Sequence, residues 1–289
     1  CVRRTDCAIA ALLFVSGAAA LIDEVLWARD WALLYGSTAT GATVVLVAYF
    51  AGLALGARAG GWLAARRDGF RVYAALELGT AVAILGYLAV RPALPGAAVW
   101  LARATAPELL PVARTVFALI VLLIPTTLLG ATLPAAAAGL RAGDAAAGGR
   151  LYAANTLGGA VGALVCGFVA VRALGVRGTF VAAAALDVLV GAAALRLTAR
   201  PASGAAAAGT PPRGVTAVAA ATGFAGLAAE VLWTRGLSGV LSSSVYSVAL
   251  VLAGCRTMPP AGPRLAEFAP GIAYTNICRV EVPWSIHVV

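Results

Sequence analysis

The sequence predicts an all-α integral membrane protein with a six-helix N-terminal half and the truncated start of a second, repeated half. The 289 residues are 62% hydrophobic and 11% charged, whereas soluble domains are about half apolar. Six apolar runs are each long enough to cross the hydrocarbon core of a bilayer, which is about 30 Å thick. A later run repeats the first. We therefore expect the lipid bilayer to surround most of this chain.

The apolar runs place each element in order. Six spans are expected at residues 8–35, 39–64, 72–90, 112–138, 150–171 and 178–197, within a first domain of residues 1–199. Residues 200–214 are rich in Pro, Ala and Gly and predict a flexible cytoplasmic linker. Residues 215–255 hold a seventh span and part of an eighth. Residues 256–289 lack helical periodicity, which predicts either a frameshifted, non-native end or a short native tail.

Membrane topology explains the 21 basic residues and the net charge of +9. The arginines stand at the ends of the apolar runs, and the inner side holds more of them when the N-terminus is placed in the cytoplasm. This pattern predicts a multi-pass membrane protein with a cytoplasmic N-terminus and argues against nucleic acid as a partner. The connection at 91–111, with Trp100 among Ala and Leu, predicts a short interfacial helix.

Metal and cofactor sites are not expected. The five cysteines show no C-x-x-C spacing, and His287 is the single histidine. Neither a zinc site nor a disulfide framework follows from such a set.

A charged motif occurs twice inside apolar surroundings. Glu24-Val25-Leu26-Trp27-x-Arg29 returns as Glu230-Val231-Leu232-Trp233-x-Arg235, and the stretches around them, residues 17–46 and 223–252, align at an offset of 206 residues. An ionisable side chain in a membrane helix costs roughly a few kcal/mol, so the duplication indicates a functional element. Glu24 and Arg29 are separated by about 140° on a helix, so each needs a partner elsewhere.

The two copies leave two pairings open. Glu24 can meet Arg235 in a structural ion pair, or it can meet Glu230 so that the two share a proton and bind a cation. Trp27 and Trp233 follow the glutamates at a distance of three residues. They are expected either to anchor the helices at the interface, which is the commoner role, or to stack on a cation.

Two further acids fall inside spans. Glu77 lies near the start of the third span, within reach of arginines 66, 67 and 71, which predicts an ordinary salt bridge. Asp187 lies near the middle of the sixth span with apolar neighbours in sequence, so we take it as the better functional candidate.

Small residues at intervals of four form two ladders for helix packing. The first ladder is Gly52, Gly56 and Gly60, and the second is Gly159, Ala163 and Gly167. Such faces allow helix backbones to approach closely.

Five sequence blocks in order resemble the membrane region of bacterial fused MFS/spermidine synthase proteins. The blocks are residues 16–29, 52–66, 73–79, 125–134 and 152–158, and the resemblance covers about residues 8 to 254. It implies the fold of a major facilitator and a following soluble domain that transfers an aminopropyl group to a polyamine. No such catalytic domain is visible in this sequence, so we do not expect enzymatic activity from this chain. In facilitators both small-residue ladders face helices of the second half, which predicts a poorly stable or oligomeric chain here.

We expect a membrane module that transports or binds a small cationic metabolite such as a polyamine. Glu24, Glu230 and Asp187 would line its cavity, together with Arg29 and Arg235. One alternative is a membrane anchor or substrate-delivery part for an aminopropyltransferase whose catalytic domain is missing here. A second alternative is a scaffold without transport.

Overall fold

The computed structural model describes residues 2–35, 38–140 and 145–197, together with isolated positions between 214 and 232. Its helices are α1 (Val2–Tyr35), α2 (Thr38–Ala64), α3 (Gly69–Val90), α4 (Leu94–Ala104), α5 (Leu110–Ala138), α6 (Ala145–Val165) and α7 (Val171–Ala194). A 3-10 turn, Arg91–Ala93, joins α3 to α4, and a π-helical turn, Cys166–Ala170, joins α6 to α7. The described part of the chain contains no strand, so the all-α prediction is confirmed.

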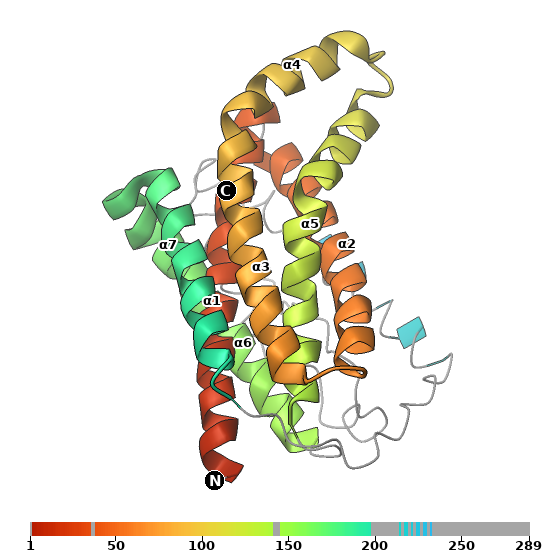
Figure 1. Cartoon of the computed structure of the whole chain (residues 1–289). Coiled ribbons are helices and arrows are strands. Elements are labelled where there is room, and N and C mark those ends of the chain that lie inside the picture. Colours follow the sequence, from red (N-terminus) through yellow and green to blue (C-terminus); the bar gives the residue numbers. More distant parts are fainter. Residues whose placement is uncertain are drawn as a thin grey trace, which may run out of the picture.

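The membrane character of the chain is also confirmed. Five helical stretches are long and apolar enough to span a bilayer: Thr5–Tyr35, Thr43–Ala64, Gly69–Ala104, Leu110–Ala138 and Ala147–Ala194. The sequence predicted two spans where the last stretch stands. That stretch is interrupted at Gly175, whose φ of 68° and ψ of 174° are not helical. In Figure 1 the chain climbs through α6 and descends through α7 beyond this point.

Neighbouring contacts give the direction of each helix. Phe14 and Ala18 of α1 meet Gly158 and Gly162 of α6 in the same order, so these helices run parallel. Tyr87 of α3 meets Phe180 of α7, and Leu78 meets Gly191, so α3 and α7 run antiparallel. The described helices therefore form one bundle in which α1, α3 and α6 rise while α2, α5 and α7 descend (Figure 1).

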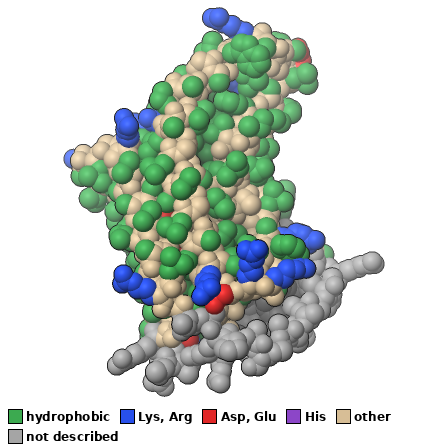
Figure 2. Space-filling view, viewed as in Figure 1, with side chains coloured by type: hydrophobic (Ala, Val, Ile, Leu, Met, Phe, Trp, Pro, Cys, Tyr) green, Lys and Arg blue, Asp and Glu red, His purple; other side chains and the backbone are tan. Residues whose placement is uncertain are grey.

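The outer surface suits a bilayer. Figure 2 shows a body covered mainly by hydrophobic side chains, with arginine side chains gathered toward the two ends. Large apolar side chains are exposed along the helices, among them Val82 at 70%, Ile120 at 70% and Leu189 at 64%. In water such exposure would drive aggregation, whereas in lipid it carries no penalty. The predicted short helix also forms: α4 follows α3, and Trp100 on it is 69% exposed.

Both small-residue ladders are buried inside this bundle. Gly52, Gly56 and Gly60 lie against residues 126–131 of α5, so closely that an added Cβ would overlap that helix. Gly159 meets Leu21 of α1, Ala163 of α6 is buried, and Gly167 is buried in the π-helical turn. The helices of the second half that the resemblance places against these ladders lie outside the described residues. Within the described residues, the ladders serve close backbone packing between α2 and α5 and between α1 and α6.

The expected linker, seventh span, partial eighth span and tail fall largely outside the described residues. The same holds for Glu230, Trp233 and Arg235.

We predict that Gly56→Ala destabilises the bundle, because the new methyl group would overlap the carbonyl oxygen of Thr127. Overpacking of this kind costs about 1–3 kcal/mol. The matched control is Gly61→Ala, since nothing lies within 4 Å of a Cβ at that exposed position. Thermal unfolding of the detergent-solubilised protein should give a lower Tm for Gly56→Ala and an unchanged or slightly higher Tm for the control. Equal Tm values would contradict the tight α2–α5 contact.

Candidate functional site

One face of α1 carries a line of polar residues through the bundle. Ser16, Asp23 and Asp30 follow one another at intervals of seven residues. Seven residues advance an α-helix by about two turns, so the three side chains share one face. Their exposed fractions are 2%, 0% and 5%, which places the whole line inside the protein. We call these three residues the polar stripe.

The first member of the polar stripe bonds to α3. The Ser16 hydroxyl donates a 2.7 Å hydrogen bond to Oε1 of Glu77, which is fully buried. The backbones of α1 and α3 have little direct contact, so these side chains bridge the space between the two helices. The Tyr73 hydroxyl, one turn before Glu77, lies near the same group. It is buried and interacts with both the Ser16 hydroxyl and the Glu77 carboxyl group.

The middle of the polar stripe faces a third helix. Asp187 of α7 is fully buried and interacts electrostatically with both Glu77 and Asp23. The thiol of Cys166 also interacts electrostatically with Asp23 and donates a 3.7 Å hydrogen bond to the carbonyl oxygen of Ile22. Three helices thus bring together three buried acids. We call Asp23, Glu77 and Asp187 the carboxylate cluster.

The carboxylate cluster lacks the partners that buried acids need. Neither oxygen of Asp23 or Asp187 has a hydrogen-bond partner among the described residues, and Oε2 of Glu77 has none either. No described basic side chain is bonded to any of the three acids. A buried polar group without a partner costs roughly 1–3 kcal/mol, and an ionised one costs more. Such a cost is typical of a working site rather than of a packing device.

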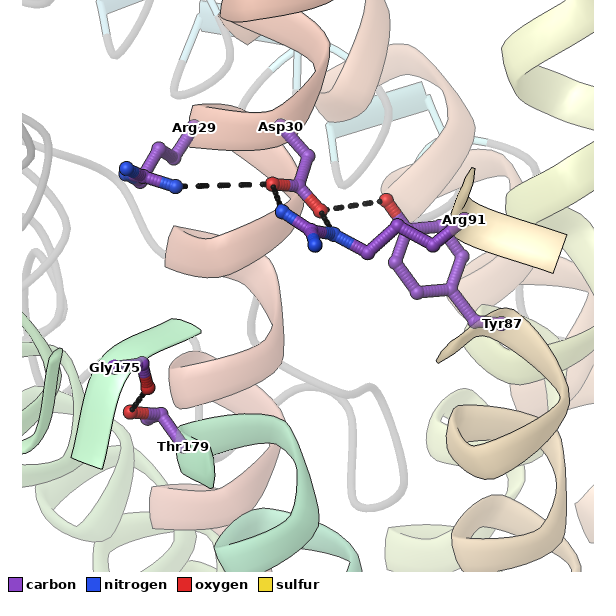
Figure 3. Close-up of polar contacts among 6 residues, drawn as sticks. All are labelled: Arg29, Asp30, Tyr87, Arg91, Gly175 and Thr179. Carbon is purple, nitrogen blue, oxygen red and sulfur yellow. Dashed lines mark hydrogen bonds and ion pairs between the residues drawn. The ribbon is translucent and has the colours of Figure 1, made fainter. Parts of the chain in front are cut away.

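The last member of the polar stripe forms an ion pair. Nε and Nη2 of Arg91 lie 2.6 Å and 2.7 Å from the two carboxylate oxygens of Asp30, which is a bidentate arrangement. The Tyr87 hydroxyl donates a 3.1 Å hydrogen bond to Oδ2 of Asp30, and Nη1 of Arg29 lies 3.9 Å from Oδ1 (Figure 3). This outer clamp, Asp30 with Tyr87 and Arg91, ties α1 to the end of α3.

Aromatic rings pack around the outer clamp. Trp27 is fully buried and meets the Tyr87 ring edge to face at 6.0 Å, and Tyr87 meets Phe180 at 5.4 Å. Trp31 contacts Tyr35 and Phe117. These contacts hold α1, α3, α5 and α7 together around the ion pair. The expected role of Trp27 as an interface anchor was therefore wrong, because its ring lies within the protein core.

Other predicted site residues are placed as follows. Glu24 is 1% exposed, beside Asp23 on α1, and Arg29 approaches Asp30 rather than Glu24. Glu77 was expected to pair with arginines 66, 67 and 71, but it accepts its bond from Ser16. Those arginines are exposed, and Arg66 stacks on the Trp62 ring at 4.0 Å instead. The pairings of Glu24 with the second copy concern residues outside the described ranges.

Sequence reasoning noted Asp23 and Asp30 but set them aside in favour of the repeated Glu and Arg, and it missed Arg91 as the partner of Asp30. Two signals could have found them. The seven-residue spacing of Ser16, Asp23 and Asp30 already implies one polar face on the first span. Asp30 and Arg91 also stand at the same end of two spans that run in the same direction, so opposite charges meet there.

The arrangement suits small cations or protons rather than a metal cofactor. Among the described residues, no group of three His, Cys, Asp or Glu side chains converges as metal ligands would. The three carboxylates of the cluster come from three different helices, α1, α3 and α7. They can bind charge in turn, by protonation or by contact with a mobile cation.

Comparison with known proteins gives no relative from which to assign the chain. No protein-family model, no curated protein and no solved structure matches it.

Proposed function

We propose that this chain is a transporter-like membrane module that moves a small cationic solute past the carboxylate cluster. The observation that carries the proposal is the set of three fully buried acids, on α1, α3 and α7, without a basic partner among the described residues. A structural ion pair would need such a partner, and the outer clamp shows how this protein builds one. The carboxylate cluster is built differently, as a place that receives positive charge.

The chemistry of the cluster selects the class of solute. Carboxylates bind ammonium groups through charge-assisted hydrogen bonds, and the Tyr73 hydroxyl adds a neutral donor and acceptor. Three buried acids on three different helices can bind a cation with more than one ammonium group. A polyamine has this form, and it agrees with the resemblance of the sequence blocks to fused MFS/spermidine synthase proteins. We therefore propose putrescine or spermidine as the solute.

The distribution of arginines supports an orientation in a bacterial inner membrane. Arg58, Arg66, Arg67, Arg71, Arg150 and Arg196 lie toward one end of the bundle. We propose that this end, and the N-terminus with it, faces the cytoplasm.

Cysteine labelling tests this orientation. Glu108 lies in the connection between α4 and α5, and Asp68 lies in the connection between α2 and α3 at the opposite end. In a cysteine-free background, Glu108→Cys should react with an impermeant maleimide in intact cells, and Asp68→Cys should not. The reverse pattern would overturn the orientation.

Uptake of labelled putrescine tests the proposed function. Proteoliposomes that contain the full chain should accumulate putrescine faster than protein-free liposomes, and unlabelled spermidine should compete. Glu108→Gln serves as a matched control, because Glu108 is an exposed acid in the connection between α4 and α5. This variant should transport as the wild type does. Equal flux with and without protein would contradict transport.

A further inference from the structure

The carboxylate cluster must be neutralised by something that the described side chains do not supply. The helices that pack on α7 are α1 and α3, with the π-helical turn as a further neighbour. The groups on these helices that interact electrostatically with Asp187 are Asp23, Tyr73 and Glu77, none of which is basic. Two nearby arginines, Arg29 and Arg91, form ion pairs with Asp30 instead. The side chains of Arg71, Arg172 and Arg177 are exposed at the surface.

The surroundings also leave no access for a hydrated ion in this conformation. Asp23, Glu77 and Asp187 are each 0% exposed. Three ionised carboxylates enclosed in this way would repel one another and would pay the full cost of burial. A metal ion would need converging ligands, which the described acids and cysteines do not provide.

A second observation points to the same ligand. The Tyr73 hydroxyl is buried and interacts with both Ser16 and Glu77. A hydroxyl can donate to an ionised carboxylate and accept from a protonated one. The neutral hydroxyls of Ser16 and Tyr73 therefore suit Glu77 in its protonated form as well as in its ionised form.

We infer that protons are the resident ligands of the carboxylate cluster, shared among Asp23, Glu77 and Asp187 on three different helices. This inference deepens the proposed function and rests on it for the role of the site. A cation that enters the cluster then displaces protons, so each inward movement of positive charge is balanced by an outward one. The module works as an exchanger of protons for a cationic solute.

Infrared difference spectroscopy of the purified full chain in lipid nanodiscs tests the inference. A protonated carboxyl group has a C=O stretching band separate from those of carboxylate and amide groups. At neutral pH the wild type should show this band. Asp187→Asn, Asp23→Asn and Glu77→Gln should each lose part of its area, and Glu108→Gln should lose none. Three separate variants keep the test decisive if one of them fails to fold.

Two results would overturn the inference. One is the absence of a protonated carboxyl band at neutral pH, which would mean ionised acids held by another cation. The other is a band that survives all three cluster substitutions at full area. Neither result depends on putrescine uptake, because the spectra are recorded without solute. A failed uptake experiment with an intact band would thus reject the proposed solute and leave the proton site standing.

Discussion

Asp187→Leu should raise the stability of this protein. Leucine keeps the branched shape of aspartate and removes two buried oxygen atoms that have no hydrogen-bond partner among the described residues. An unsatisfied buried polar group costs about 1–3 kcal/mol, so its removal should increase the free energy of unfolding by a similar amount. Thermal unfolding of the detergent-solubilised variant should therefore show a higher Tm than the wild type.

The direction of this change separates two roles for Asp187. A residue that holds helices together lowers Tm when it is replaced, whereas a residue kept for function at the expense of stability raises it. Glu108→Leu is the matched control, since the exposed Glu108 should change Tm little. A Tm for Asp187→Leu that falls below the wild type would mean that Asp187 has a structural partner.

Arg91→Met should destabilise the protein more than any surface substitution. It leaves Asp30, which is 5% exposed, without the bidentate guanidinium that now neutralises it. Loss of one partner from a fully buried pair costs roughly 3–5 kcal/mol. Because the Arg91 side chain is 33% exposed, water can replace part of the interaction, and we expect about 2–3 kcal/mol.

A double substitution isolates the ion pair from other effects of Arg91. Asp30→Asn combined with Arg91→Met removes both charges, so the double variant should be more stable than Arg91→Met alone. Arg103→Met is the control at an exposed arginine of α4 and should leave Tm within error. If the two single changes simply add in the double variant, Asp30 and Arg91 do not act as a pair.

Composition and run length were sufficient to predict the class of the fold. A long apolar stretch can adopt few backbone structures in a bilayer, because every backbone N–H and C=O group there needs a hydrogen-bond partner. A helix supplies these partners within itself. The same reasoning placed α4, whose Trp100 stands among small apolar residues. The two spans predicted at 150–171 and 178–197 differ from the structure mainly in their junction. The helical conformation continues through a π turn to Gly175, and a break at a single glycine leaves little trace in hydropathy.

Partners across helices were harder to predict than the helices themselves. Glu77 has three arginines close to it in sequence, yet the bundle turns it inward to Ser16, 61 residues away. Trp27 follows the repeated glutamate at a position that suits the membrane–water interface. In the structure its ring is buried and packs against Tyr87. In both cases tertiary packing decided the partner, and local spacing could not reveal it. Asp187 was identified because an acid with apolar neighbours stands out without any knowledge of packing.

The central claim is that the carboxylate cluster serves the movement of a cation, and putrescine uptake by Asp187→Asn proteoliposomes tests it most directly. Asparagine preserves the size of the side chain and removes its negative charge. We predict that uptake falls to the level of protein-free liposomes in this variant while Glu108→Gln keeps the wild-type rate, at equal amounts of folded protein. Uptake by Asp187→Asn at the wild-type rate would contradict the claim.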